Sequence, residues 1–134
     1  MRFLHLALVA SLVTILAGCE SAPVKDIQRG INDLFKGGNR AEQTLQSGIQ
    51  QYENGNYAEA SRLLQASLDQ GLGQADRVRA HKYLAFIHCV SGRDARCRDE
   101  FRAALRIDPS FELAANEAGH PIWGPVFRSV KGRR

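Results

Sequence analysis

The fold is decided by residues 80–110, which read AHKYLAFIHCVSGRDARCRDEFRAALRIDPS. Apolar side chains recur in this stretch at steps of three and four residues, which is the spacing of one helix face. The pattern breaks at Ser91-Gly92 and stops at Asp108-Pro109, because glycine and proline both end helices. The stretch therefore predicts two antiparallel helices joined by a short turn.

Each expected helix carries one packing face on which small and large residues alternate, as close helix packing requires. The two faces consist of Leu84, Ala85 and His88 in the first helix and Cys97, Phe101, Ala104 and Leu105 in the second. The order Leu-Ala-x-x-His-x-x-x-Gly-x-x-x-x-Cys-x-x-x-Phe-x-x-Ala-Leu-x-x-Asp-Pro closely resembles a tetratricopeptide repeat (TPR). The departures are His81, His88 and Cys97, where that pattern usually has an aromatic residue, a tyrosine and an alanine. The resemblance implies a scaffold and does not specify a function.

A weaker copy of the pattern lies 37 residues earlier in the chain. Its matching positions are Gly48 for Ala85, Gly55 for Gly92, Ala60 for Cys97, Leu64 for Phe101 and Leu68 for Leu105. Since a regular TPR has a period of about 34 residues, about three residues are extra. We expect them in a longer loop over residues 69–76, with Gln74 or Asp76 beginning the next helix.

The N-terminus has the pattern of a lipoprotein signal peptide over residues 1–18. Arg2 gives a positive start, and residues 3–17 form an almost unbroken apolar run of 15, which is short for a membrane span. Residues 16–19 read Leu-Ala-Gly-Cys, which matches the bacterial lipobox. The small residues fit the signal peptidase, and the thiol of Cys19 receives the lipid, so acyl chains such as palmitate hold the mature N-terminus in a membrane. The alternative is a plain transmembrane anchor with a chance cysteine.

The residue after the lipobox cysteine indicates the location of the protein, and the charge of the mature chain indicates the character of its surface. Glu20 stands where lipoproteins retained in the inner membrane have aspartate, which favours the outer membrane, facing the periplasm. The formal net charge is +4, and 17 basic and 14 acidic side chains follow residue 18. This mild excess predicts a somewhat basic surface and not a nucleic-acid-binding protein.

Residues 19–40 are expected to form a tether and a short amphipathic helix. The apolar positions of this helix are Val24, Ile27, Ile31, Leu34 and Phe35, at helical spacing. Gly30 weakens the helix by roughly 1 kcal/mol, and Gly37-Gly38-Asn39 is expected to end it. The segment either lies on the membrane or a partner, with Lys25, Arg29 and Lys36 at its edges, or folds against the repeats as a linker helix.

With Cys19 lipidated, Cys89 and Cys97 remain as a pair. In an oxidising periplasm, an even number of cysteines predicts a disulfide. Cys89 lies near the end of one expected helix and Cys97 near the start of its antiparallel partner, so their Cβ atoms can come within bridging range. Closing such a short loop contributes about 2–3 kcal/mol of stability in the entropy model.

Other chemistry at these positions is disfavoured. A metal site from His81, His88, Cys89 and Cys97 would lack compact ligand spacing, and Cys89 points about 100° away from His88 on the helix. A reactive thiol pair beside Arg93, Arg96 and Arg98 is the other alternative. We expect the histidines to be polar residues lining the helix-packing groove. No nucleophile, phosphate-binding or zinc-protease motif occurs, so we expect no enzyme, cofactor or metal.

A basic face extends from Arg77 to Arg106. Its eight basic residues are Arg77, Arg79, Lys82, Arg93, Arg96, Arg98, Arg102 and Arg106, against the three acidic residues Asp94, Asp99 and Glu100. Solubility explains such a face. The functional alternative is docking of an acidic partner, anionic head groups or glycans, for which Arg96 and Arg98 are candidates.

After Pro109, Phe111 to Ala118 are expected to form a helix that caps the second repeat and completes a repeat domain over residues 41–118. Residues 119–134 are a separate segment, in which two prolines argue against regular helix. Trp123 and Phe127 either fold back to close the end of the superhelix or form an exposed anchor for a partner. The basic tail from residue 128 is expected to fray.

The chain as a whole resembles small TPR lipoproteins associated with the bacterial type VI secretion system. The resemblance rests on the lipobox, the two repeats, the Cys89/Cys97 pair and the ending Glu-x-x-His-Pro-x-Trp-Gly-Pro-Val-Phe, of which residues 120–127 are the most specific part. It implies an accessory role in assembling or anchoring an envelope-spanning machine. Membrane subunits of that machine are the implied partners.

The sequence therefore predicts an all-α protein: a short TPR-like superhelix of about two repeats plus a capping helix, after a lipoprotein signal peptide. We expect a non-enzymatic adaptor for an envelope protein. Its candidate partner-binding residues are His81, His88, Arg96, Arg98, Trp123 and Phe127. The alternatives are a TPR lipoprotein that regulates envelope or peptidoglycan assembly, and a purely structural outer-membrane lipoprotein.

Overall fold

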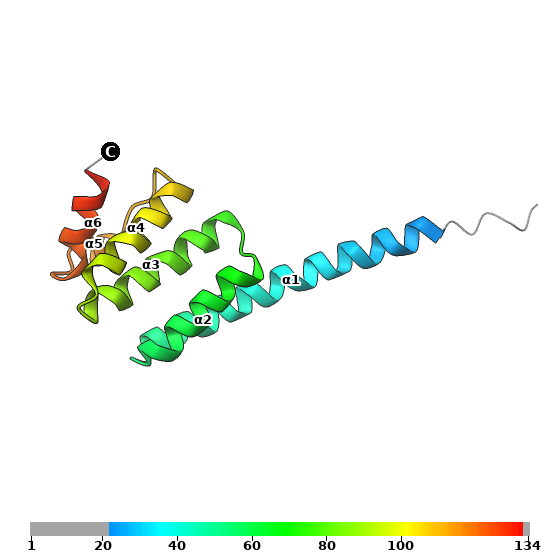
Figure 1. Cartoon of the computed structure of the whole chain (residues 1–134), viewed down its shortest axis with the longest axis horizontal. Helices are drawn as coiled ribbons and strands as arrows, with labels where there is room; N and C mark the ends of the chain where they lie inside the picture. Colours follow the sequence, from blue (N-terminus) through cyan, green and yellow to red (C-terminus); the bar gives the residue numbers. More distant parts are fainter. Residues whose placement is uncertain (1–21, 133–134) are drawn as a thin grey trace, which may run out of the picture. The chain divides into compact units, whose positions relative to one another are not determined.

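A computed structural model describes residues 22–132 of the 134-residue chain, so the expected signal peptide and Cys19 lie outside the described residues. The protein is all-α, as predicted: every regular element in the described part is a helix (Figure 1). The helices are α1 (Ala22–Glu53), α2 (Tyr57–Gln70), α3 (Gln74–Val90), α4 (Asp94–Ile107), α5 (Ala115–Ala118) and α6 (Trp123–Lys131). None of the described helices combines the length and the apolar character needed to cross a membrane.

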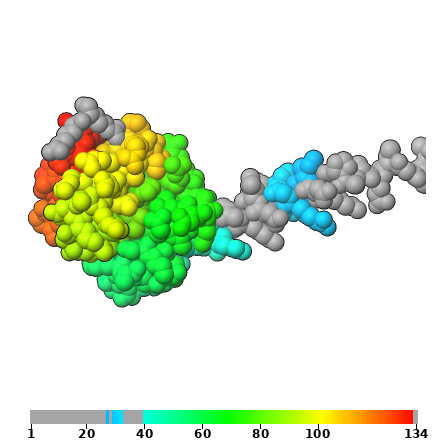
Figure 2. Space-filling model, viewed as in Figure 1, coloured from blue at the N-terminus to red at the C-terminus, as the bar shows by residue number. Residues whose placement is uncertain are grey.

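The chain divides into two compact units, Met1–Asp33 and Leu34–Arg134. The described part of the first unit is the beginning of α1, where Ile27 and Ile31 are exposed. All sites considered below lie in the second unit, which contains the hairpins and forms a closely packed body (Figure 2).

The first hairpin consists of α1 from Ala41 onward and α2. Gly55 adopts a left-handed φ of 78° in the turn between them, a conformation that favours glycine. The core of this hairpin contains Ala41, Leu45 and Ile49 of α1, Ala60 and Leu64 of α2, and Leu84 and Ile87 of α3. Gly48 is required by a close approach, because a Cβ there would lie 3.0 Å from Cγ of Leu64.

The second hairpin consists of α3 and α4, and it confirms the predicted break and stop. Gly92 has a φ of 69° in the turn, and α4 ends at Ile107, before Pro109. All residues predicted for the two packing faces are buried: Leu84, Ala85, His88, Cys97, Phe101, Ala104 and Leu105. The helical periodicity thus identified the core of this hairpin correctly.

The helix expected to end at Gly37-Gly38 does not end there, because α1 continues to Glu53. Glycine in a helix interior costs about 1 kcal/mol relative to alanine, which a long helix tolerates, and the one proline of α1, Pro23, lies in its first turn. The long loop expected over residues 69–76 is also wrong. Only Gly71, Leu72 and Gly73 separate α2 from α3, and Leu72 is buried, but α3 does begin at Gln74, one of the two residues predicted to begin it.

The C-terminal cap comprises residues 108–131 and differs most from expectation. Of the helix predicted over residues 111–118, only α5 forms. Helix α6 forms where two prolines argued against one, since Pro125 is its third residue and the first-turn N–H groups of a helix have no intrahelical partner anyway. The tail is helical through Lys131, with Val130 buried, instead of frayed. Helix α6 packs on α4 and α3 (Figure 1).

Candidate functional site

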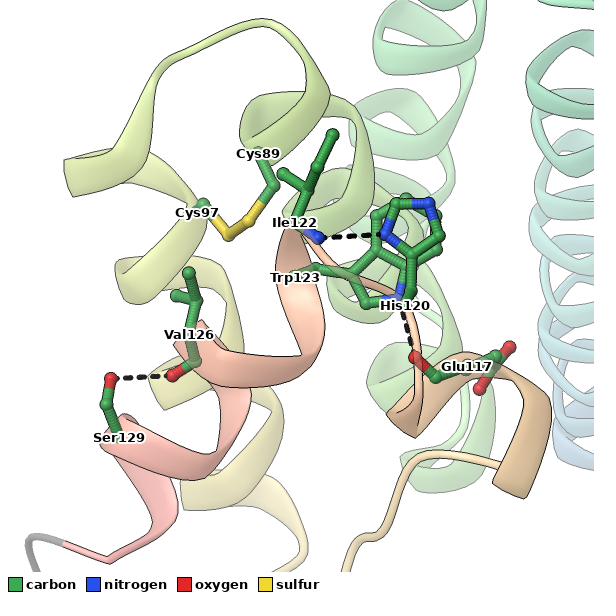
Figure 3. The surroundings of a disulfide bond; sticks show 8 residues. All are labelled: Cys89, Cys97, Glu117, His120, Ile122, Trp123, Val126 and Ser129. Atoms are coloured by element: carbon green, nitrogen blue, oxygen red, sulfur yellow. Dashed lines mark hydrogen bonds between the residues drawn. A yellow bond between two sulfur atoms is a disulfide. The ribbon is translucent and has the colours of Figure 1, made fainter.

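Trp123 and Phe127 lie in the core of the C-terminal cap, with 8% and 3% of their surfaces exposed. The Trp123 ring stacks on Phe86 at 4.3 Å between centroids. Its Nε1–H donates a hydrogen bond to the Glu117 carbonyl oxygen at 2.9 Å (Figure 3). Phe127 contacts the ring of Phe101 at 5.2 Å. The two side chains therefore close the end of the fold, which is the first of the two predicted alternatives, and the structure contradicts the second, an exposed anchor for a partner.

The two candidate histidines are held between α3 and α4. His81 Nδ1 lies 2.7 Å from Glu100 Oε2, and both side chains are largely covered. His88 is 8% exposed, and its Nδ1 has no hydrogen-bond partner. Burial lowers the pKa of His88, and Arg93 lowers it further. Both rings thus lie in the helix interface, as expected of polar residues that line the helix-packing groove, and little of either is left accessible to a partner.

The predicted disulfide is present: Cys89 and Cys97 are joined, with their Cα atoms 5.1 Å apart. Both cysteines are buried, so the bridge ties the end of α3 to the first turn of α4 within the core. Among the described residues, no group of three or more His, Cys, Asp or Glu side chains is arranged to hold a metal ion.

The basic residues of α3 and α4 separate into paired and unpaired sets. Ion pairs join Arg79 to Asp76, Lys82 to Glu117 and Arg102 to Asp99. Within the described part of the chain, five of the eight basic residues of this face have no ion pair: Arg77, Arg93, Arg96, Arg98 and Arg106. Arg96 is exposed and Arg98 partly exposed. Among the described residues, neither arginine has a hydrogen bond, ion pair or ring contact with the buried candidates Trp123 and Phe127.

A feature that the sequence did not reveal is a continuous row of ring contacts, which we call the aromatic row. It consists of Tyr57 of α2, Tyr52 of α1, Tyr83 and Phe86 of α3, Trp123 of α6, and His120 just before α6. Successive ring centroids are 5.7, 5.1, 5.9, 4.3 and 3.2 Å apart. Such offset and edge contacts each add roughly 0.5–1.5 kcal/mol beyond burial.

The aromatic row has a covered end and an open end. Phe86 and Trp123 are buried, whereas Tyr57 is 39% exposed and Tyr52 and Tyr83 are partly exposed. The open end contains all three tyrosines of the chain. Sequence spacing cannot find this cluster, because its members come from three helices and meet only after the two hairpins pack together.

The tyrosine hydroxyls at the open end are available for hydrogen bonding. In the described part of the chain, none of the three has a hydrogen-bond partner. Burial raises the pKa of Tyr52 to about 12, and it also raises the pKa of Tyr83, with Glu117 adding to both effects. Both hydroxyls therefore stay protonated at neutral pH and are able to donate hydrogen bonds to a ligand.

An ion pair fixes the edge of the aromatic row. Lys82 Nζ lies 2.6 Å from Glu117 Oε1, with both side chains less than one-fifth exposed, and 4.8 Å from the Tyr83 ring centroid. Glu117 also accepts a hydrogen bond from the Ala114 N–H at 3.0 Å. The pair thereby joins the C-terminal cap to α3 beside Tyr83.

No protein-family model matches the chain, and no curated protein or solved structure matches it. Function is therefore inferred from the residues and their geometry alone. The arrangement offers ring faces and hydrogen-bond donors suited to binding a ligand by surface contact.

Proposed function

We propose that the chain is a non-enzymatic, lipid-anchored adaptor that binds another protein in the periplasm through a scaffold of two TPR-like helix pairs. The observation that carries the proposal is the open end of the aromatic row. There, three partly or fully exposed tyrosines present ring faces and unpartnered hydroxyls on a rigid scaffold. Tyrosine is enriched at protein interfaces because it combines apolar area with a polar group.

The TPR-like interpretation is supported by equivalent positions in the two hairpins. Gly55 and Gly92 both occupy left-handed turn positions, 37 residues apart. Gly48 packs under Leu64 in the first hairpin, and Ala85 and Phe101 share a core cluster in the second. The same spacing thus brings a small and a large residue into the core of each hairpin, which supports the repeat, and α6 of the cap packs on the second hairpin.

The lipid anchor and the outer-membrane location are supported by the lipobox around Cys19 and by Glu20. The buried disulfide is consistent with an oxidising compartment, since disulfides persist in the periplasm and are rare in the cytosol. Acyl chains on Cys19 would keep the adaptor at the membrane, where its partners are envelope proteins.

An accessory role in type VI secretion is part of the proposal, with membrane subunits of that machine as partners. It rests on the resemblance of residues 120–127. In the structure, Trp123 and Phe127 of this segment are core residues, so the segment supports a shared fold more directly than a shared partner. The alternatives are a regulator of envelope or peptidoglycan assembly and a purely structural outer-membrane lipoprotein.

The test is affinity purification of the lipidated, C-terminally tagged protein after cross-linking in cells, with mass spectrometry of what is recovered. A Cys19→Ser form serves as the matched control, because it removes the lipid site and leaves the helical domain unchanged. Recovery of secretion-machine membrane subunits that depends on Cys19 supports the proposal. Recovery of cell-wall synthases instead would support the regulator, and recovery of no protein would contradict the adaptor.

A further inference from the structure

The first unit of the chain exposes two large apolar side chains on one side of a helix. Ile27 and Ile31, in the first three turns of α1, have 61% and 42% of their surfaces exposed (blue in Figure 2). They are four residues apart, so both lie on the same helix face. Arg29, midway between them in the sequence, is exposed on the opposite side, because two residues turn a helix by about 200°. The beginning of α1 is therefore amphipathic.

The lipid expected on Cys19 is close to this apolar face along the chain. Three residue steps join Cys19 to Ala22, where α1 begins, and three steps span at most about 11 Å. Since a helix rises about 1.5 Å per residue, the Cα atom of Ile27 lies within about 18 Å of the Cys19 Cα atom, and that of Ile31 within about 24 Å. Acyl chains on Cys19 hold that residue at the bilayer surface, so both isoleucines are within reach of lipid.

The size of the apolar face favours lipid over a protein partner. Among the described residues of this unit, Ile27 and Ile31 together expose about as much surface as one whole isoleucine. That is a small part of the roughly 800 Å² that each partner contributes to a stable protein interface. Burying one isoleucine shifts an equilibrium roughly ten- to a hundred-fold. This gain is sufficient for a surface to which the chain is already tethered, because no separate molecule has to be immobilised.

We propose that the beginning of α1 lies along the membrane surface, with Ile27 and Ile31 inserted into the lipid and Arg29 facing water. This inference rests on the lipid anchor of the proposed function and adds a second membrane contact to it. A helix that lies in the membrane plane buries its apolar face about 5–10 Å deep, at the boundary between head groups and acyl chains. The acyl chains hold the protein at the membrane, and the two isoleucines determine which side of α1 faces the lipid.

The test measures the surroundings of spin labels in the mature, lipidated protein, reconstituted in vesicles of dioleoylphosphatidylcholine. This zwitterionic lipid is sufficient because residues 22–33 contain two basic and two acidic side chains and thus have no net charge. The native pair Cys89 and Cys97 does not take the label, since it forms a buried disulfide. One label at a time is attached to Ile27→Cys, Ile31→Cys, Arg29→Cys or Asn32→Cys.

Collisions of each label with oxygen, which concentrates in the bilayer, are compared with its collisions with a water-soluble nickel complex. We expect the oxygen-to-nickel collision ratio to be several-fold higher at positions 27 and 31 than at positions 29 and 32. The matched control is the chain from residue 19 onward, carrying Cys19→Ser, without vesicles. In this control the four positions should give similar ratios, because all four are exposed.

Similar ratios at the four positions of the lipidated protein would overturn this inference. Low collision rates with both reagents at positions 27 and 31 would overturn it as well, because they indicate cover by protein, a second copy included. In either case, acyl chains found on Cys19 by intact mass would leave the lipid anchor of the proposed function standing. If the intact mass shows no acyl chain, that anchor is contradicted, and this inference fails with it.

Discussion

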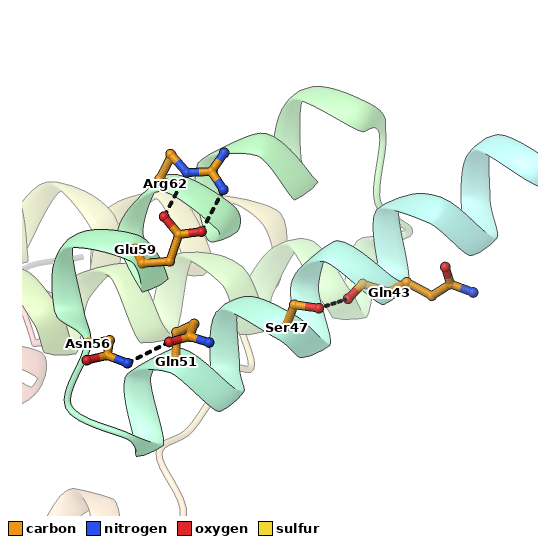
Figure 4. Close-up of polar contacts among 6 residues, drawn as sticks. All are labelled: Gln43, Ser47, Gln51, Asn56, Glu59 and Arg62. Carbon is orange, nitrogen blue, oxygen red and sulfur yellow. Dashed lines mark hydrogen bonds and ion pairs between the residues drawn. The ribbon is translucent and has the colours of Figure 1, made fainter.

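The two hairpins share one plan but are held together differently. The first packs Gly48 directly under Leu64 and is covered by α3. Its outer surface carries local polar contacts such as Gln51–Asn56 and Glu59–Arg62 (Figure 4). The second hairpin contacts α2 and α6 and contains the disulfide. The same sequence pattern thus gives one hairpin that lies at the edge of the fold and one that lies at its centre. We therefore expect substitutions in the second hairpin to lower the free energy of unfolding more than substitutions in the first.

The largest expected effect follows from removing the central ring of the second hairpin. Phe101→Ala is expected to lower the free energy of unfolding by about 3–5 kcal/mol, because Phe101 contacts Phe86 on α3 and Phe127 on α6. Leu64→Ala, at the equivalent position of the first hairpin, is expected to cost less, since no cap rests on it. Urea unfolding of both variants measures the difference, and a larger loss for Leu64→Ala would contradict the central role of the second hairpin.

Removing the disulfide tests how much this bond stabilises the second hairpin. The double variant Cys89→Ala/Cys97→Ala is expected to lose about 2–3 kcal/mol, because the unfolded chain regains the freedom of the short loop. Chemical denaturation with and without reductant measures the loss. Reduction should destabilise the parent protein by a similar amount and leave the double variant unchanged. If reductant destabilises both proteins equally, its effect does not come from this bond.

The close approach in the first hairpin predicts a smaller loss. In Gly48→Ala, the new Cβ would lie 3.0 Å from Cγ and 3.1 Å from the backbone nitrogen of Leu64, and such overpacking costs about 1–3 kcal/mol. Gly30→Ala is the matched control, because no heavy atom lies within 4 Å of a Cβ there and alanine favours a helix. A stabilising Gly48→Ala in thermal unfolding would show that the hairpin is more loosely packed than described.

The smallest expected effect concerns pH and the buried His88. Burial and Arg93 lower its pKa in the folded protein, Glu100 opposes this shift, and Arg96 adds to it. Because the folded pKa lies below the unfolded value of about 6.5, this contribution to stability is present above about pH 6.5 and lost as the pH falls below it. The unfolding midpoint should therefore drop between pH 7.5 and 5, and less so in His88→Gln. An identical drop in both proteins would refute the assignment.

The sequence predicted those parts of the fold that depend on neighbouring residues. The turn at Gly92, the stop before Pro109 and the Cys89–Cys97 bridge all follow from helical periodicity and local spacing. The helix end predicted at Gly37-Gly38 is wrong, because two glycines weaken a helix but do not necessarily end it. A prediction from local sequence was thus correct where neighbouring residues alone determine the turn or the helix end, and wrong where they only weaken the helix.

The C-terminal cap and the aromatic row could not be predicted from local sequence patterns, because they are formed by contacts between residues far apart in the sequence. Phe111 lies outside α5, with its ring 5.5 Å from that of Phe127 on α6. Whether Trp123 is buried or exposed depends on the space beside Phe86, which periodicity does not reveal. The tyrosines of the open end likewise meet only through tertiary packing, so the predicted site was centred on residues that prove to be core.

The most direct test of the partner-binding face is site-specific photo-cross-linking in cells, with p-benzoylphenylalanine replacing either Tyr57 or Arg102 in the lipidated protein. Tyr57 lies at the open end of the aromatic row, whereas Arg102 is exposed on α4, where it pairs with Asp99. We expect a cross-linked envelope protein from position 57 and none from position 102. Cross-linking from position 102 alone, or from neither position, would contradict binding through the tyrosines.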